Sequence, residues 1–150
     1  MINYIVGDLL EAKEKVIVHG CNNYGVMGSG VAKQIRAKWP NVFDEYHLKY
    51  QVFGLELGSI IPVETTDGKI VVNAITQDGF GKDGARYVVY EAVEKCFMTI
   101  NEKALDWNAS EIAMPRIGAG LGGGDWTIIE DIITRTAKNY VPIVYDFKVD

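Results

Sequence analysis

Short apolar runs alternate with longer amphipathic segments along the chain. The runs are rich in β-branched residues and predict six strands, at residues 2–7, 15–20, 58–64, 69–76, 110–115 and 142–147. Apolar residues at helical spacing predict four helices, at residues 29–38, 41–53, 85–105 and 127–140. Because strands and helices alternate, we expect an α/β fold, a three-layer α/β/α sandwich with a mixed, mostly parallel six-stranded sheet.

Two of the predicted helices carry specific expectations. Pro40 is expected to end the first helix, since proline cannot continue a helical hydrogen-bond ladder. The longest helix is expected to present one apolar face, formed by Val89, Val93, Phe97, Ile100 and Leu105.

Length and composition narrow the class of protein. The chain has 150 residues, so we expect residues 1–150 to form a single domain. The net charge of -5 argues against a broad nucleic-acid surface. Cys21 and Cys96 form no CxxC pair, which argues against a zinc site or a disulfide framework and favours a reducing, cytoplasmic compartment. We expect no signal peptide, because the N-terminus has no basic region followed by an apolar core. We expect no membrane helix, because no apolar run approaches roughly 18 residues.

Two glycine-rich loops each follow a predicted strand and precede a predicted helix, at residues 22–30 and 115–126. Ligands of open α/β sheets bind beyond the carboxyl ends of the strands, where such loops gather. Glycine lets a ligand reach the main chain, and successive N–H groups beside a helix N-terminus form an anion cradle. The first loop alone is as well explained by a tight turn, but the second has five glycines between Gly118 and Gly124. Together they predict a diphosphate site.

The familiar phosphate-binding motifs are absent from both loops. No GxxxxGK[ST] sequence occurs, so a P-loop is not indicated. The stretch "GSGVAK" lacks the third glycine or alanine of GxGxxG, and the first glycine loop follows the second strand instead of the first. A dinucleotide-dependent dehydrogenase is therefore not expected.

Several polar side chains near these loops have both a structural and a chemical interpretation. His19 ends a strand and is either a hydrogen-bonded core histidine or a catalytic acid, base or nucleophile. Asn22 and Asn23 either shape a turn or bind ribose hydroxyls. Asp125 is either a helix N-cap or a catalytic group, and Asp8 either forms a turn or accepts a hydrogen bond from an exocyclic amine.

Three stretches of the chain resemble the macro domain family. They are "VGDLL" near the N-terminus, "VHGCNNYGVMGSGVAKQI" around the first loop and "MPRIGAGLGGGDW" around the second. The resemblance covers essentially the whole chain and implies the macro domain fold and an ADP-ribose site. "HGCN" and the second loop are most similar to the branch of ADP-ribose 1″-phosphate phosphatases and terminal ADP-ribose-glutamate hydrolases. The larger branch has an asparagine where this chain has His19.

The resemblance also implies a role for individual residues. Asp8 would hold the adenine amino group, with the backbone N–H of Leu9 nearby, and Asn22 would contact the distal ribose. Phe147 would pack on adenine, although an ordinary core position explains it equally well. The phosphates would be wrapped by the two loops, through Gly28, Ser29, Gly30 and Val31 in the first and Ile117, Gly118, Ala119, Gly120 and Leu121 in the second.

The leading activity implied by the resemblance is removal of the 1″-phosphate from ADP-ribose 1″-phosphate. His19 would attack the phosphate or move a proton, Asn22 would position the ribose, and Asp125 would orient water. The alternatives are hydrolysis of ADP-ribose from a modified macromolecule, and a reader that binds ADP-ribose without catalysis. No metal or cofactor is implied.

One departure from the family concerns the lysine and aspartate of the ADP-ribose-glutamate hydrolases. At the matching positions this chain has Gln77 and Gly122, so a lysine-adduct mechanism is not expected. Lys82 follows five residues after Gln77 and is expected to be an exposed loop lysine.

Overall fold

The computed structural model describes residues 1–147 and contains six strands and four α-helices in that range. The strands are β1 (Asn3–Val6), β2 (Val16–Asn22), β3 (Ile60–Glu64), β4 (Ile70–Gln77), β5 (Glu111–Met114) and β6 (Val141–Asp146). The helices are α1 (Gly30–Lys38), α2 (Pro40–Phe53), α3 (Tyr90–Asp106) and α4 (Trp126–Thr136), together with the short 3-10 helix η1 (Leu9–Glu11). None of the helices in this range is both long and apolar enough to cross a bilayer.

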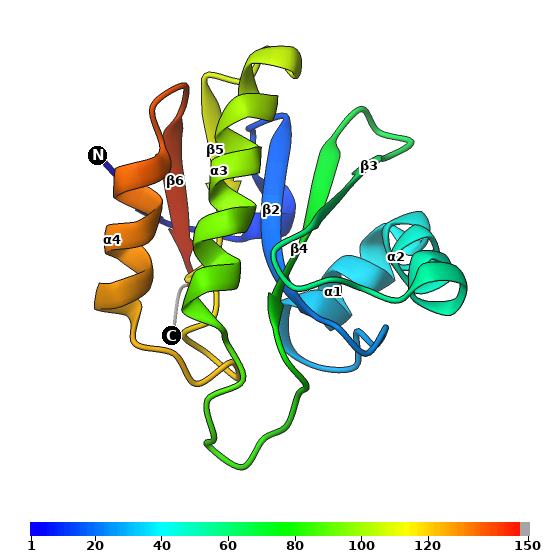
Figure 1. The fold of residues 1–150 in the computed structure, drawn as a ribbon. Helices are drawn as coiled ribbons and strands as arrows, with labels where there is room; N and C mark the ends of the chain where they lie inside the picture. The colour runs from blue at the N-terminus through cyan, green and yellow to red at the C-terminus, as the bar shows by residue number, and fades with distance from the viewer. Residues whose placement is uncertain (148–150) are drawn as a thin grey trace.

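The strands form one sheet in the order β1-β6-β5-β2-β4-β3. All neighbouring strands are parallel except β3 and β4, which are antiparallel. Helices α3 and α4 cover one face of the sheet, and α1 and α2 cover the other (Figure 1). The predicted three-layer sandwich with a mixed, mostly parallel six-stranded sheet is therefore confirmed.

Strand β2 is central because both of its faces are covered. Val16 and Val18 belong to the apolar cluster under α3 and α4, whereas Ile17 belongs to the cluster under α1 and α2. Side chains of a strand point alternately to its two faces, so a strand buried on both sides needs a continuous apolar run. This requirement explains why the run "VIV" ends only at His19, next to the carboxyl end of the strand.

The predicted start of the longest helix was wrong. Helix α3 begins at Tyr90 instead of residue 85, because the preceding residues make other hydrogen bonds. The N–H groups of Tyr87 and Val88 donate to the carbonyl of Gly122, at 2.7 and 3.1 Å, and the N–H of Val89 donates to Thr76. These tertiary contacts keep residues 87–89 out of the helix.

The face predicted for the longest helix was correct in its middle but not at its two ends, since Val89 precedes α3 as its N-cap. Val93, Phe97 and Ile100 are buried, but Leu105 is 67% exposed and Ala104 takes the inward position. The last helix ends at Thr136, four residues earlier than predicted, because the carboxamide of Asn101 accepts hydrogen bonds from the N–H groups of residues 138 and 139. Pro40 does end α1, and it also begins α2 as its first residue.

Phe97→Ala is expected to lower the free energy of unfolding by about 3–5 kcal/mol, because it leaves a cavity where a fully buried ring stood. Urea denaturation followed by circular dichroism measures the change. The matched control is Met98→Ala on the same helix, since Met98 is 57% exposed. That control should change the unfolding free energy by less than about 0.5 kcal/mol. Similar losses in the two variants would contradict the assigned helix faces.

Candidate ligand-binding site

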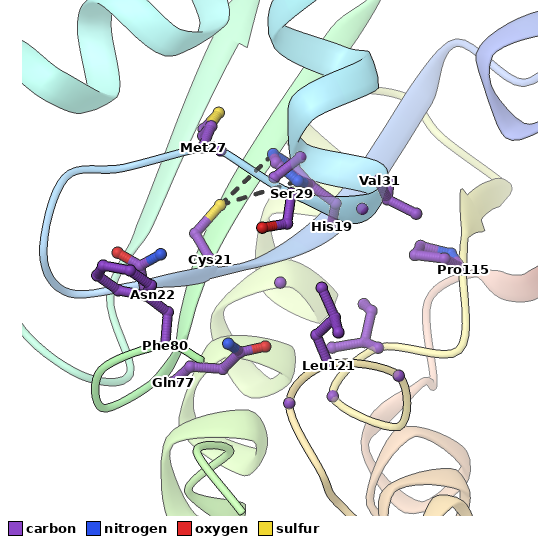
Figure 2. A pocket seen from close by; sticks show the side chains of 18 of the residues that line it. His19, Cys21, Asn22, Met27, Ser29, Val31, Gln77, Phe80, Pro115 and Leu121 are labelled. Carbon is purple, nitrogen blue, oxygen red and sulfur yellow. Dashed lines mark hydrogen bonds between the residues drawn. The ribbon is translucent and has the colours of Figure 1, made fainter. Parts of the chain in front are cut away.

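A cavity of about 580 Å³ opens where β2, β4 and β5 end, and we call it the main cavity. Its walls are the first loop, the second loop and the β4–α3 loop (residues 78–89) (Figure 2). Figure 2 shows Val31 and Leu121 facing each other across it. The structure brings together here most of the residues singled out in the sequence, namely His19, Asn22, Gly28, Ser29, Gly30, Val31, Ile117, Gly118, Gly120 and Leu121.

A second hollow of about 340 Å³ adjoins the main cavity, and we call it the side cavity. Asp8, Leu9 and Phe147, the residues that the resemblance assigned to adenine, all line it. Ala119 lines it too, although it was expected beside the phosphates in the second loop. The two cavities adjoin, because they share four lining residues, which are Val31, Pro115, Arg116 and Gly120, and we call them together the continuous groove. An elongated ligand can therefore extend from Asp8 to the first loop.

Sequence reasoning missed two residues that line the side cavity, the aromatic Tyr145 and the charged Arg116. The Tyr145 ring lines it from β6, and its hydroxyl donates to the buried carboxylate of Glu14. Arg116 lies at the junction of the cavities, where its guanidinium is paired with Asp146 at 2.7 Å. Tyr145 looks like an ordinary strand position in the sequence, and the parallel pairing of β6 with β5 brings it to the groove. Arg116 lies in the second loop, but nothing in the sequence singled out its side chain.

Asp125 is not brought to either cavity. Its carboxylate accepts a hydrogen bond from the N–H of Thr127 at 2.9 Å and so caps the first turn of α4. Its own N–H donates to the hydroxyl of Tyr90 at 3.0 Å. This placement agrees with the N-cap interpretation of Asp125 and leaves its expected catalytic role without support.

The glycines of the two loops fall into two groups. Gly118 is needed by the fold, because its φ is +75° and a Cβ there would lie 2.7 Å from the side chain of Val88. Gly28 and Gly120 are different: both line the main cavity, neither has a positive φ, and a Cβ on either would meet no atom within 4 Å. The fold itself therefore does not require glycine at these two positions.

The second loop also presents unused hydrogen-bond donors. Within residues 1–147, the N–H groups of Gly120, Leu121 and Gly122 donate to no protein acceptor. All three residues line the main cavity. Consecutive free N–H groups form a concave site of positive potential, which suits an anion.

Asn22 is held in place by α2. The hydroxyl of Tyr46 donates to the Asn22 carbonyl at 2.7 Å and lies 3.0 Å from its side-chain oxygen. The Asn22 amide nitrogen donates to Val26 at 3.0 Å, and the N–H of Tyr24 donates to the Asn22 side-chain oxygen at 2.9 Å. Burial raises the pKa of Tyr46, so its hydroxyl stays protonated and keeps donating. One N–H of the Asn22 amide remains available to a ligand.

His19 lies in the wall of the main cavity but is almost entirely covered, with 1% of its surface exposed. Its Nε2 donates to the Asn73 side-chain oxygen at 2.6 Å, and the Asn73 amide nitrogen donates to Val42. Burial lowers the pKa of His19 to about 4, and the hydrogen bond that the ring donates to Asn73 only partly opposes this change. The ring is therefore neutral at neutral pH.

The thiol of Cys21 completes this buried group. Its sulfur lies 3.5 Å from Nε2 and 3.9 Å from Nδ1 of His19 (Figure 2). Burial raises the pKa of the Cys21 thiol, so it is not a thiolate. His19 and Cys21 are therefore both neutral and hydrogen-bonded, and they form the floor of the cavity.

The β4–α3 loop is the third wall of the main cavity, and the sequence did not predict it. Phe80 and Lys82 line the cavity from this segment, and Gln77 lines it from the end of β4. Asn23 anchors one end of the loop, since its side chain donates to Asp78 at 3.2 Å and accepts from the N–H of Gly79 at 3.0 Å. Lys82 is exposed, as expected, but it also borders the cavity. Across residues 1–147, no three His, Cys, Asp or Glu side chains gather in a metal-binding arrangement.

The family is decided by a comparison with known protein families. The family model of the macro domain matches residues 18–133 of the chain. The chain belongs to the macro domain family. The match includes most of β2, both glycine loops and the β4–α3 loop, so it spans every wall of the main cavity.

Three curated proteins are similar to most of the chain. A 17.5 kDa protein of Enterobacteria phage T4 is 33% identical and covers 99% of this chain and 97% of its own length. The DNA ADP-ribosyl glycohydrolase of Mycobacterium bovis is 30% identical over 87% of this chain, which spans only 37% of that relative. The ADP-ribose 1″-phosphate phosphatase of Candida albicans is 26% identical and covers 89% of this chain and 92% of its own length.

A solved macro domain has the same fold. The macrodomain of Mycobacterium tuberculosis DarG superposes with a TM-score of 0.84 and 26% sequence identity, over 97% of both chains. Two of these relatives, those of Mycobacterium bovis and Candida albicans, are named as hydrolases, so the chain is a macro domain with hydrolase homologues.

The stability of the protein is expected to fall in mild acid because of His19. Its folded pKa is about 4 and its ordinary value is 6.5, so the unfolded chain takes up the proton first. The contribution of the neutral His19 ring to the free energy of unfolding is complete above about pH 6.5. It is lost as the pH falls to about 4. At about pH 5 this group should account for a loss of about 2 kcal/mol.

Urea unfolding at neutral pH and at about pH 5, for the wild type and His19→Gln, measures this effect. The wild type should lose about 2 kcal/mol more than the variant between the two conditions. An equal loss in both proteins would show that the proton is taken up elsewhere.

Proposed function

We propose that this macro domain binds ADP-ribose along the continuous groove and hydrolyses the bond at C1″ of the distal ribose. The observation that carries the proposal is the pair Gly28 and Gly120, which line the main cavity without any demand from the fold for glycine. A ligand in contact with the backbone would explain the glycines, because a side chain at either position would occupy the space of the ligand. The free N–H groups of the second loop favour an anionic group at the same place.

The groove assigns each part of ADP-ribose to one region. Adenine occupies the side cavity, where the Asp8 carboxylate accepts from its amino group and the ring of Tyr145 or Phe147 packs against it. The diphosphate lies between the two glycine loops. The distal ribose then reaches Asn22, whose amide retains one free N–H for a hydroxyl.

The burial of His19 favours attack at carbon over attack by the imidazole on phosphorus. With 1% of its surface exposed and Nε2 engaged by Asn73, the ring is poorly placed as a nucleophile. In the reaction proposed here, water forms a bond to C1″ and loses a proton to solvent. The bond from C1″ to its substituent breaks, and the electron pair leaves with the substituent. The second-loop N–H groups and Lys82 stabilise the charge that develops.

This chemistry accommodates both kinds of substrate suggested by the relatives. One relative is named a DNA ADP-ribosyl glycohydrolase and another an ADP-ribose 1″-phosphate phosphatase. Cleavage between C1″ and oxygen would release phosphate from ADP-ribose 1″-phosphate, and cleavage at C1″ would also release ADP-ribose from a macromolecule. We favour release from a macromolecule, because the exposed Phe80 and Lys82 leave the C1″ end of the groove next to solvent.

Gly28→Ala is expected to weaken ADP-ribose binding by about 1–3 kcal/mol, because the added methyl group projects into the ligand space. Isothermal titration calorimetry measures the affinity. The unfolding free energy should stay constant or rise by up to about 1 kcal/mol, since the site is open and the unfolded chain loses freedom. Unchanged affinity would remove the first loop from the ADP-ribose site.

Hydrolysis of ADP-ribose 1″-phosphate in water enriched with oxygen-18 tests the bond that is broken. Cleavage at C1″ should release phosphate without the label, because the solvent oxygen joins the sugar. The label is followed in phosphate by mass spectrometry, since the anomeric hydroxyl exchanges its oxygen with water. Labelled phosphate would instead show attack at phosphorus. Tight ADP-ribose binding with no product from this substrate or from an ADP-ribosylated macromolecule would leave only the reader function.

A further inference from the structure

The carboxamide of Gln77 is a polar group of the main cavity that makes no contact of its own with the protein's hydrogen-bonding groups. Gln77 is half-buried and lines the cavity from the end of β4. Among the described residues only its backbone takes part in hydrogen bonds, for example by accepting from the N–H of Asn23 at 3.1 Å. The side chains of His19 and Asn22 in the same cavity are both engaged. Gln77 therefore keeps an acceptor oxygen and two N–H donors for a ligand.

An irregularity in the sheet places this side chain at the distal-ribose end of the cavity. Cys21 of β2 pairs with Ile75 of β4. The next residue of β2, Asn22, pairs with Gln77, so Thr76 is an extra residue in β4. A bulge of this kind changes the direction of the side chains beside it, and bulges are frequent next to active sites. As a result Gln77 stands directly opposite Asn22, the residue to which the distal ribose is assigned.

The carboxamide reaches toward the second loop. Figure 2 shows the Gln77 side chain extending across the cavity to the side where Leu121 lies. Its oxygen is 2.8 Å from the position that a Cβ on Gly122 would take, so the bare backbone there leaves room for the carboxamide. The N–H of the next residue, Asp78, donates to the carbonyl of Tyr87 at 2.9 Å and holds the chain in place. A side chain that starts from a fixed backbone loses less freedom when it binds.

The exposure of the cavity walls indicates the side from which water attacks. In the proposed reaction the substituent on C1″ leaves toward solvent, past the exposed Phe80 and Lys82. A displacement in line brings water from the opposite, more covered side, and Gln77 is less exposed than either of these residues. Its carboxamide oxygen can accept a hydrogen bond from that water and so direct a lone pair of the water at carbon.

We propose that the Gln77 carboxamide holds the water that attacks C1″ and is a catalytic residue of this reaction. The inference rests on the proposed function, since it names the group that positions its nucleophile. The water donates one hydrogen bond to Oε1 of Gln77 and forms its new bond to C1″. The bond from C1″ to the substituent breaks, and the electron pair leaves with the substituent. The proton of the water passes to solvent, because an amide oxygen is too weak a base to keep it.

The test measures kcat and KM separately for Gln77→Met, which keeps the length of the side chain and removes its hydrogen-bonding atoms. The substrates are ADP-ribose 1″-phosphate, an ADP-ribosylated peptide and an ADP-ribosylated oligonucleotide, and each one that the wild type hydrolyses is compared. The variant should lower kcat by about 10- to 100-fold, because the water is no longer held in line. The loss should be similar for every substituent, and KM and the Kd for ADP-ribose should change by less than about twofold.

Gln77→Glu separates the acceptor oxygen from the N–H donors. The carboxylate keeps the acceptor, so the variant should retain more than about a tenth of the wild-type kcat at neutral pH. It can also take the proton of the water, so its kcat relative to the wild type should fall as the pH drops toward the ordinary glutamate pKa of about 4.3. A variant as inactive as Gln77→Met would overturn the inference, since the N–H donors would then be the atoms that matter.

The matched control is Gln51→Met, because Gln51 is an exposed residue of α2 that lines neither cavity. It should leave kcat and KM unchanged. Urea unfolding checks the fold of both variants. Gln77→Met should unfold at the same urea concentration as the wild type, because the carboxamide holds no hydrogen bond to the part of the chain that the structure describes.

The outcomes separate failure of this inference from failure of the proposed function. If the wild type hydrolyses a substrate at C1″ but Gln77→Met keeps kcat within about twofold, Gln77 does not hold the water and the proposed function stands. A rise in KM at unchanged kcat would have the same meaning, since Gln77 would then only bind substrate. If the wild type hydrolyses none of the substrates, or the oxygen-18 label shows attack at phosphorus, the proposed function fails and the inference fails with it.

Discussion

The pairing of β2 with β4 on one side and β5 on the other is the interaction on which the rest of the structure depends. All three strands run in the same direction, so their carboxyl ends meet at one edge of the sheet. The first loop, the β4–α3 loop and the second loop leave from these ends and form the main cavity. Because β2 is buried on both faces, its register is fixed, and His19 and Asn22 take defined positions beneath and beside the ligand space.

The three loops support one another as well as the ligand. Asn23 links the first loop to the start of the β4–α3 loop, and the carbonyl of Gly122 accepts from the N–H groups at the end of it. Tyr46, on α2, fixes the position of the Asn22 carbonyl by donating a hydrogen bond to it. Binding energy is thus not spent on ordering the walls, which is the usual advantage of a preorganised site. The same network explains why residues 87–89 leave the helix predicted for them.

Burial separates the two interpretations of the polar residues that the sequence left open. His19 is buried and hydrogen-bonded to Asn73. Burial lowers the pKa of its ring, which is therefore neutral, and its contacts are those of a structural residue. Asp125 serves as the N-cap of α4 and is turned away from both cavities. Lys82, an unremarkable loop residue in the sequence, borders the cavity instead. The proposed chemistry therefore relies on backbone N–H groups, Asn22 and Lys82 more than on a side-chain nucleophile.

The sequence by itself determined the fold class, the succession of strands and helices along the chain, and the two glycine loops, because hydrophobic periodicity and glycine content are local properties. It also selected most of the residues that line the groove, since these lie in the loops that follow predicted strands. Only the tertiary structure decided what the remaining residues do. Tyr46, Tyr145, Arg116 and Phe80 reach the site through packing between segments far apart in the chain. The protonation of His19 depends on burial by those segments, which no local pattern encodes.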